Sequence, residues 1–171
     1  MGHPGLIRSA TPADLPAIAA LHLQSWRATY AELLPADYLN DGARAQLAKK
    51  WAVLPEGTTL VAMQGNSLAG FVSVDAANPA YVDALHVADF AQGAGLGPRL
   101  LGAAFARIAK NGVSSAYLYI VAGNDGARRF YERLGAVETW RGPDPDYDFP
   151  STAIRFDWAD ISALVRADEA S

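Results

Sequence analysis

The chain contains no cysteine, which excludes disulfides, thiolate nucleophiles and cysteine-based metal sites. Histidine is scarce as well. His3, His22 and His86 lie far apart, and no two of them have the spacing of metal ligands. We therefore expect no metal site. The absence of cysteine is compatible with a reducing compartment.

Long apolar runs and basic stripes are missing too. No stretch approaches the roughly 20 apolar residues of a membrane span, and the N-terminus lacks a signal-peptide pattern. The net charge is −4 and the pI about 5.2, while the nearest approach to a basic patch is Lys49-Lys50 or Arg128-Arg129. Such pairs are typical of solvated helix faces. We expect a soluble, cytoplasmic protein with neither a nucleic-acid nor a membrane partner.

What is present is an ordinary globular composition. The 171 residues are 51% hydrophobic and 19% charged, which suits a single domain over residues 1–171 with one core. Periodicity predicts seven strands, at Leu6–Ser9, Thr58–Gln64, Ser67–Asp75, Ala80–Val87, Ala116–Val121, Ala136–Trp140 and Thr152–Trp158. It also predicts about four helices. The first runs from Thr11 to about Arg27, the second from about Ala36 towards Trp51 with a break at 40–42, the third over 98–111 and the fourth over 124–135. A last helical turn is expected near 161–165.

The middle of the chain sets the fold class. Strand 80–87, helix 98–111 and strand 116–121 form a βαβ unit, which predicts a parallel pair within an α+β domain. The segment Ala116–Val121 is almost continuously apolar, so we expect it to be buried on both faces.

A glycine-rich loop, Gln92-Gly93-Ala94-Gly95-Leu96-Gly97, directly precedes the helix that opens at Pro98. Free amides at a helix N-terminus suit a phosphate or pyrophosphate. A Walker loop would need Gly-Lys-Ser/Thr, but Pro98-Arg99 follows. A dinucleotide fingerprint would need a third glycine, but Pro98 stands there and the next strand ends without a ribose-binding acid. A glycine-rich turn without a ligand is the alternative that the loop alone leaves open.

Two motifs together resemble a known family. Gln92–Gly97 resembles the Q/R-x-x-G-x-G/A motif of the GNAT superfamily, the N-acetyltransferases that use acetyl-coenzyme A. The segment Asn124–Ala136 (N-D-G-A-R-R-F-Y-E-R-L-G-A) resembles the family's second motif, N-x-x-A-x-x-F-Y-x-x-x-G-F. The resemblance implies a three-layer α/β arrangement with a mixed sheet of about seven strands, in which parallel strands 4 and 5 splay apart. It also allows a homodimer.

The resemblance further implies a role for each part of the site. The pyrophosphate of acetyl-coenzyme A would lie on Gln92, Gly93, Ala94, Gly95, Leu96, Gly97 and Pro98, and the acyl arm between strands 80–87 and 116–121. The thioester carbonyl would take an N–H near Leu85, His86 and Val87, a donor for the developing oxyanion. Asn124, Ala127 and Tyr131 would complete the coenzyme site. Tyr131 matches the family's general acid, since a phenol with a pKa of about 10 holds its proton at pH 7. Alternatively, Tyr131 only fills the apolar face of its helix.

The general base departs from the family pattern. Many relatives place a glutamate where this chain has Tyr81, which cannot readily act as a base near pH 7. Asp83 and His86 are the nearest substitutes, and strand alternation predicts that they face opposite sides. His86 has the better intrinsic pKa, about 6.5, but it could equally be a hydrogen-bonded strand residue. An ordered water, or an amine that arrives neutral, would need no basic residue.

The family's acceptor side is usually lined by the first helix and nearby loops, which suggests Trp26, Arg27, Tyr30 and Tyr147 here, with Phe149 beside them. Core packing is the alternative for Trp26. The resemblance thus implies transfer of an acetyl group to a primary amine of a small molecule, peptide or protein by direct attack on the thioester. A second interpretation is a non-catalytic sensor or interaction module that binds acyl-coenzyme A with the same fold.

Overall fold

The computed structural model describes residues 5–147 and 149–170, so His3 lies outside the described residues. The elements follow in chain order: β1 (Leu6–Ser9), η1 (Pro12–Asp14), α1 (Leu15–Tyr30), η2 (Tyr38–Gly42), α2 (Ala43–Lys50), β2 (Thr58–Gln64), β3 (Ser67–Val74), β4 (Ala80–Val87), η3 (Asp89–Ala91), α3 (Leu96–Ala109), β5 (Ala116–Val121), α4 (Asp125–Arg133), β6 (Val137–Pro143), β7 (Thr152–Trp158) and α5 (Ser162–Glu169).

The strands form a seven-stranded sheet in the order β1-β2-β3-β4-β5-β7-β6. Only the β4–β5 pair is parallel; the other neighbouring strands run antiparallel. The predicted mixed α+β sheet is therefore confirmed. The residues 40–42 do not break the second helix. They belong to the π-helical turn η2, which leads directly into α2. A full helix, α5, stands where a single turn was expected.

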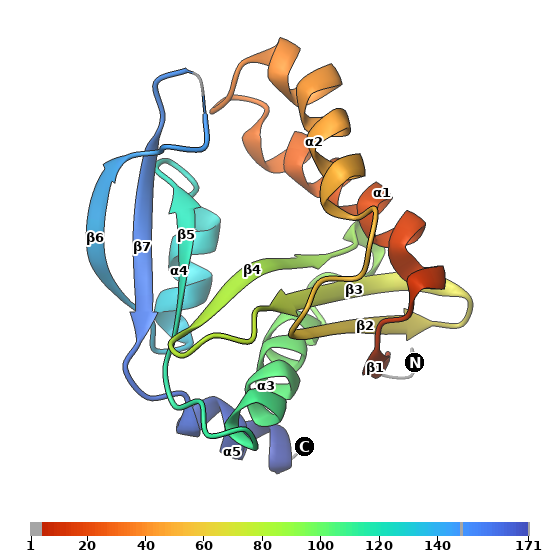
Figure 1. Ribbon diagram of the computed structural model, residues 1–171, viewed down its shortest axis with the longest axis vertical. Helices are drawn as coiled ribbons and strands as arrows, with labels where there is room; N and C mark the ends of the chain where they lie inside the picture. The colour runs from red at the N-terminus through yellow and green to blue at the C-terminus, as the bar shows by residue number, and fades with distance from the viewer. Residues whose placement is uncertain (1–4, 148, 171) are drawn as a thin grey trace.

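The parallel strands separate almost at once. β4 and β5 pair only at Ala80–Ala116 and Tyr81–Tyr117, after which the two strands diverge, as Figure 1 shows. The sheet is thereby divided into a β1–β4 half and a β5–β7 half joined at one corner. From residue 82 onward, the side of β4 that faces β5 has no strand partner. The splay that the family resemblance implied is present.

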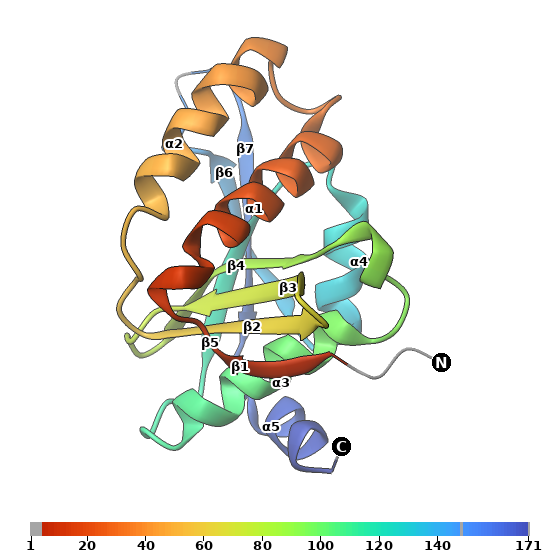
Figure 2. The same ribbon diagram turned by 90° about the vertical axis from the view of Figure 1, so that its right-hand side faces the viewer.

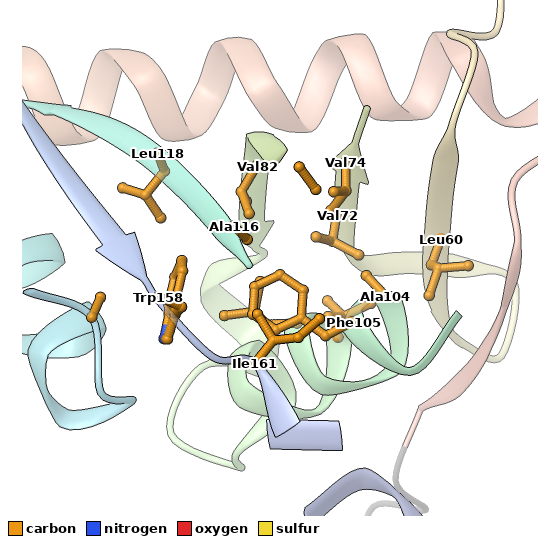
Figure 3. Packing of buried hydrophobic residues seen from close by; sticks show 14 of the residues in the cluster. Leu60, Val72, Val74, Val82, Ala104, Phe105, Ala116, Leu118, Trp158 and Ile161 are labelled. Atoms are coloured by element: carbon orange, nitrogen blue, oxygen red, sulfur yellow. The ribbon is translucent and has the colours of Figure 1, made fainter. Parts of the chain in front are cut away.

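Different helices cover the two faces of the β1–β4 half of the sheet. In Figure 2, α1 and α2 lie over one face of β1–β4, while α3 and α5 lie on the opposite side. The α3 side holds the larger core, in which Phe105 is fully buried and meets Trp158 edge to face at 5.2 Å (Figure 3). Apolar residues at i, i+3, i+4 and i+7 along α3 supply this core, as their spacing predicted.

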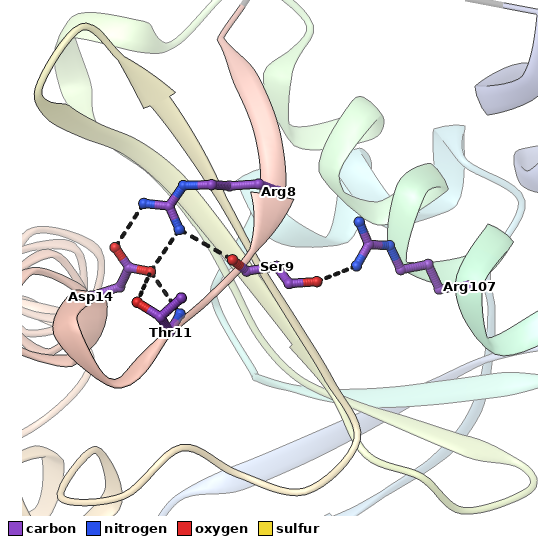
Figure 4. A network of polar contacts seen from close by, with 5 residues as sticks. All are labelled: Arg8, Ser9, Thr11, Asp14 and Arg107. Atoms are coloured by element: carbon purple, nitrogen blue, oxygen red, sulfur yellow. Dashed lines mark hydrogen bonds and ion pairs between the residues drawn. The ribbon is translucent and has the colours of Figure 1, made fainter.

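A polar network connects β1 with η1 and α3 (Figure 4). The Arg8 guanidinium donates to both carboxylate oxygens of Asp14, at 2.8 and 2.9 Å, and the Thr11 amide donates to the same carboxylate at 2.8 Å. Mainly through the hydrogen bond from Arg8, the pKa of Asp14 falls to about 2. Arg107 of α3 donates to the Ser9 hydroxyl. The network fixes β1 against both α1 and α3.

The expectation that β5 is buried on both faces is wrong. Tyr119 is 43% exposed and Tyr117 is half-buried, although Ala116, Leu118 and Ile120 are buried as expected. The reason is that α1 and α2 do not extend over β5–β7, so aromatic rings cover one another there. Tyr117 stacks on the Tyr81 ring at 5.2 Å and carries the Arg155 guanidinium 4.0 Å from its own ring centre.

Candidate active site

A cavity of about 930 Å³ occupies the gap between β4 and β5. It extends from the glycine loop and α4 at one end to α1, α2 and the β6–β7 loop at the other. Most sequence-predicted site residues line it: Trp26, Tyr30, Asp83, Leu85, His86, Val87, Gln92, Gly93, Gly95, Leu96, Gly97, Pro98, Asn124, Ala127, Tyr131 and Tyr147. Ala94, Arg27 and Phe149 are not among the lining residues.

The glycines of the loop are needed for two different reasons. Gly93 and Gly95 have φ values of 80° and 77°, and a side chain there would meet nothing within 4 Å, so backbone conformation is what selects glycine. Gly97 lies in the first turn of α3, where a Cβ would come within 3.1 Å of the Phe130 ring. It therefore allows α3 and α4 to pack closely. The helix begins at Leu96, two residues before the predicted start, so the free first-turn amides lie beside Gly95.

The Gln92 side chain fastens the loop to β4. Its amide nitrogen is 3.3 Å from both the Val87 carbonyl and the Asp89 carboxylate. The family's first motif position is thus occupied here by a residue that also bonds to the strand before the loop.

A β-bulge changes which way β4 presents its side chains. Ser73 pairs with Ala84 and Val74 pairs with Val82, so Asp83 is an extra residue in β4. Val82 packs in the α3 core, whereas Ala84 packs in the α1 core, although unbroken alternation would place both on one face. Asp83 and His86 both face α1 and α2. The expectation that they face opposite sides is therefore wrong.

The backbone of β4 offers donors to the gap. The Ala88 amide donates to the Ala69 carbonyl at 2.8 Å, so residues 88 and 86 bond towards β3. By the alternation of an antiparallel ladder, Leu85 and Val87 direct their N–H and C=O groups towards the gap instead. The bond from Gln92 to the Val87 carbonyl agrees with this direction. These two amides are therefore free to donate a hydrogen bond into the gap.

Tyr131 of α4 lies on the opposite wall. Its ring meets Phe130 and Trp158 edge to face, at 5.0 and 5.9 Å. Its hydroxyl makes no hydrogen bond to any residue in the described part of the chain. Burial, with a smaller contribution from Tyr30, raises the pKa of Tyr131 above its ordinary value of about 10. The cavity thus contains a half-buried phenol that stays protonated at neutral pH.

Asn124 caps α4, and its side-chain oxygen accepts the Ala127 amide at 3.2 Å. Asparagine is among the residues preferred at this position. Because Asn124 also lines the cavity, a contact with the coenzyme arm is compatible with the cap.

Two histidine side chains lie close together on the α1 side of β4. The rings of His22 and His86 are 4.5 Å apart, and Phe71 lies within 6 Å of both. The indole N–H of Trp51 donates to His22 Nδ1 at 3.0 Å. Burial lowers the pKa of His86 to about 4. Burial, together with the charges of His86 and Lys50, lowers that of His22 to about 2. Both imidazoles are neutral at pH 7.

The acceptor residues chosen from the sequence separate into two groups. Trp26, Tyr30 and Tyr147 line the cavity. Arg27 instead donates to the carbonyls of Leu39 and Asn40, at 2.8 and 3.0 Å, and so ties α1 to η2.

Sequence reasoning missed several lining residues. They include His22, Ser25, Thr29, Gln46, Leu47, Lys50, Phe130, Arg133, Asp144 and Asp146, together with β5 residues 118–121. The β5 residues follow from the splay itself. Asp144 and Asp146 had one available signal, since they flank Pro145 in the same loop as Tyr147. No group of three or more His, Cys, Asp or Glu residues within 5–147 and 149–170 is arranged to hold a metal ion.

The mixed sheet splays at its parallel pair, and a glycine loop lies at one end of the gap. A half-buried phenol lies across the gap from free strand amides. This combination is typical of an acyltransferase site. The family model described as "Acetyltransferase (GNAT) family" matches residues 16–136. The chain therefore belongs to the GNAT acetyltransferase family and is an acetyl-coenzyme A-dependent N-acetyltransferase, as the motifs predicted.

Individual relatives agree with this assignment. The uncharacterized N-acetyltransferase YuaI of Bacillus subtilis is 26% identical over 168 residues, which cover 92% of this chain and 95% of the relative. The PaiA N-acetyltransferase of Thermoplasma acidophilum, solved in complex with coenzyme A, is 22% identical with a TM-score of 0.72, over 90% of this chain and 98% of that one. YncA of Salmonella typhimurium, solved with acetyl-coenzyme A, is 20% identical with a TM-score of 0.67, over 93% and 95%. The last two show the shared fold.

In the described residues, no helix is both long enough and apolar enough to cross a bilayer.

Proposed function

We propose that the gap between β4 and β5 holds acetyl-coenzyme A, with its pyrophosphate at the start of α3 and its thioester beside Leu85 and Val87. The observation that carries this proposal is the continuity of one cavity from Gly93 and Gly95 to Tyr131. The amides near Gly95 and the positive end of the α3 dipole favour a polyanion at that end. Arg133 is the cationic side chain that lines the same end of the cavity.

Each step of the transfer has a group of this chain beside it. The acceptor amine attacks the thioester carbon, and the N–H groups of Leu85 and Val87 stabilise the oxyanion that forms. The C–N bond forms and the C–S bond breaks. Tyr131 gives its proton to the departing thiolate, which leaves as free coenzyme A.

His86 is the better of the two predicted bases. The Asp83 carboxylate is held in an ion pair by Lys50. The His86 ring makes no side-chain hydrogen bond to a residue of the described chain and is unprotonated at pH 7, so its lone pair is available, but a pKa of about 4 makes it a weak base. A water between His86 and the amine would serve the same purpose. We infer that Asp83 positions Lys50 and that it does not take the proton.

The coenzyme site can be tested with a matched pair of glycine variants. Gly95→Glu places a carboxylate at the proposed pyrophosphate site, whereas Gly65→Glu places one at the β2–β3 turn. Both glycines have positive φ, 77° and 61°, and open space around a Cβ, so the backbone strain is comparable. Calorimetry should show coenzyme A binding weakened at least about tenfold by Gly95→Glu, because 1.4 kcal/mol of repulsion suffices for that. Gly65→Glu should bind like wild type.

Unchanged binding by Gly95→Glu would mean that the pyrophosphate lies elsewhere. Turnover is measured as thiol release from acetyl-coenzyme A over a panel of primary amines, with both variants as controls. Coenzyme binding without release on any amine would favour the alternative of an acyl-coenzyme A sensor.

A further inference from the structure

The end of the cavity remote from the glycine loop has a distinctive lining. We call it the acceptor end and define it by Trp26, Tyr30, Tyr81, Tyr119 and Tyr147, with the charged side chains Lys50, Asp83, Asp144 and Asp146 among them. Aromatic rings come from α1, β4, β5 and the β6–β7 loop. A cation near such rings is attracted by their π faces.

Three carboxylates line this end, but their charges are not equally available. Asp83 is neutralised by its ion pair with Lys50. Asp144 and Asp146 form no ion pair with a lysine or arginine of the described chain. The Asp146 amide donates to the Asp144 carboxylate at 2.9 Å, which leaves further acceptor positions on both side chains. The acceptor end therefore carries net negative charge on the β6–β7 loop.

Both of these carboxylates lie close to rings from several elements. Burial is the main cause of the raised pKa of Tyr30 in α1 and of Tyr81 in β4. Asp144 adds to the rise for Tyr30, and Asp83 and then Asp146 add to it for Tyr81. Both loop carboxylates are thus near aromatic rings that line the acceptor end. The neighbouring Lys50 shows that an ammonium group fits within this same lining, since it is paired there with Asp83.

The reacting nitrogen cannot be the cation that these carboxylates attract. An amine must be neutral to attack the thioester, and the thioester lies beside Leu85 and Val87 on the proposed coenzyme geometry. Asp144 and Asp146 belong to a different element at the other end of the cavity. A ligand that satisfies both ends needs one amino group at β4 and a separate cation at the β6–β7 loop.

Packing at this end also limits the size of the ligand. Tyr147 and Phe149 of the β6–β7 loop pack against Tyr38 of η2, with both ring pairs at 5.3 Å. The loop therefore reaches across to the segment between α1 and α2, as Figure 1 shows at the top of the molecule. A flexible small molecule reaches between these elements more easily than the surface of a folded protein does.

We propose that the acceptor is a small aliphatic diamine, one amino group of which is acetylated while the other, as an ammonium, is held by Asp144 and Asp146. This assignment rests on the proposed function of the cavity. In the reaction the attacking nitrogen forms the C–N bond and loses its proton towards His86 or solvent. The C–S bond breaks, Tyr131 protonates the thiolate, and the second ammonium is unchanged.

Steady-state kinetics with four matched acceptors tests the proposal. Butane-1,4-diamine, 4-amino-1-butanol, butylamine and 4-aminobutanoate differ mainly in the group remote from the reacting nitrogen. We expect kcat/KM for the diamine to exceed that for the amino alcohol about tenfold through KM, beyond the factor of two from its two equivalent amines, since a hydrogen bond to a charged partner is worth this much. The amino acid should be the poorest acceptor.

The variants Asp144→Asn, Asp146→Asn and the double variant keep an oxygen for the bond inside the loop but remove the charge. They should lower kcat/KM for the diamine towards the value for the amino alcohol and leave butylamine within about twofold. Glu56→Gln, an exposed acid outside the cavity, is the matched control and should change nothing. Thermal unfolding confirms that each variant is folded.

Two outcomes overturn the proposal in distinguishable ways. Turnover of butylamine and the diamine at equal kcat/KM, or a diamine preference that survives in the double variant, overturns the diamine assignment alone. Coenzyme A binding with no acetylation of any of the four amines overturns both this assignment and the proposed direct transfer in the cavity.

Discussion

The replacement Tyr131→Phe isolates the proton transfer to the thiolate. In the folded protein the Tyr131 hydroxyl has no hydrogen-bond partner among the described residues, and its ring contacts with Phe130 and Trp158 do not need the oxygen. Removing the hydroxyl leaves no polar group without its hydrogen-bond partner, so the free energy of unfolding should change by less than about 0.5 kcal/mol. The loss should appear in the chemistry, as a fall in kcat of about 10²- to 10⁴-fold, the range for a general acid.

The assay benefits from the composition of the chain. Because the protein contains no cysteine, a thiol reagent reports only the coenzyme A released. Single-turnover measurements prevent slow product release from masking the change. Tyr117→Phe, which removes a phenol from β5 outside the cavity, is the control and should retain wild-type kcat. If Tyr131→Phe folds normally and its single-turnover rate stays within threefold of wild type, Tyr131 is not the acid.

Three further predictions concern stability. Burial holds the pKa of His22 near 2 and of His86 near 4, both below the unfolded value of about 6.5. As pH falls from about 6.5 to 4, the unfolded chain binds protons that the native state excludes. The free energy of unfolding should therefore fall by up to ~1.4 kcal/mol per pH unit for each histidine. Urea unfolding at pH 7, 6 and 5 checks this, and a free energy that does not change with pH would contradict it. Phe105→Ala, at a fully buried ring, should cost about 3–5 kcal/mol in the same measurement, and a loss below 1 kcal/mol would show that the α3 core readily collapses. Asn124→Ala should cost about 1 kcal/mol through the lost α4 cap, with Asn124→Ser retaining most of it.

The sequence predicts most of the fold because its local signals agree with one another. The apolar spacing along α3, the cap at Asn124 and the Gly65-Asn66 turn each specify one element and its neighbours. The error at β5 has a different origin. Tyrosine is apolar enough to look buried, yet its hydroxyl is compatible with solvent, so a run such as Ala116–Val121 reads the same whether or not a helix covers it. Which face α1 and α2 cover is a tertiary property that the strand itself does not encode.

The parts of the candidate site that consist of short sequence motifs could be predicted, and the parts assembled from distant segments could not. The glycine-loop end consists of two short motifs, in which the positive φ of Gly95 and the cap at Asn124 each require a particular residue at a fixed position. The acceptor end is assembled from five elements distant in sequence, so Lys50, Asp144 and Asp146 could not be related to one another in advance. Arg27 shows the opposite case, since its position in α1 was right but its guanidinium bonds to backbone carbonyls of η2.

The extra residue in β4 determines which groups of the strand face the cavity. Without a bulge, the faces set by Ala80 and Val82 would continue to Ala84 and His86, and both would point into the α3 core. Because Asp83 is inserted, His86 turns instead towards α1 and lines the cavity. The backbone direction shifts with it, so that the amides of Leu85 and Val87, and not those of Ala84 and His86, face the gap. The bulge therefore brings an imidazole to the acceptor side and also turns the proposed oxyanion donors towards the gap. It also brings Asp83 to Lys50, which neutralises that carboxylate and leaves Asp144 and Asp146 as the charges that a second ammonium would meet.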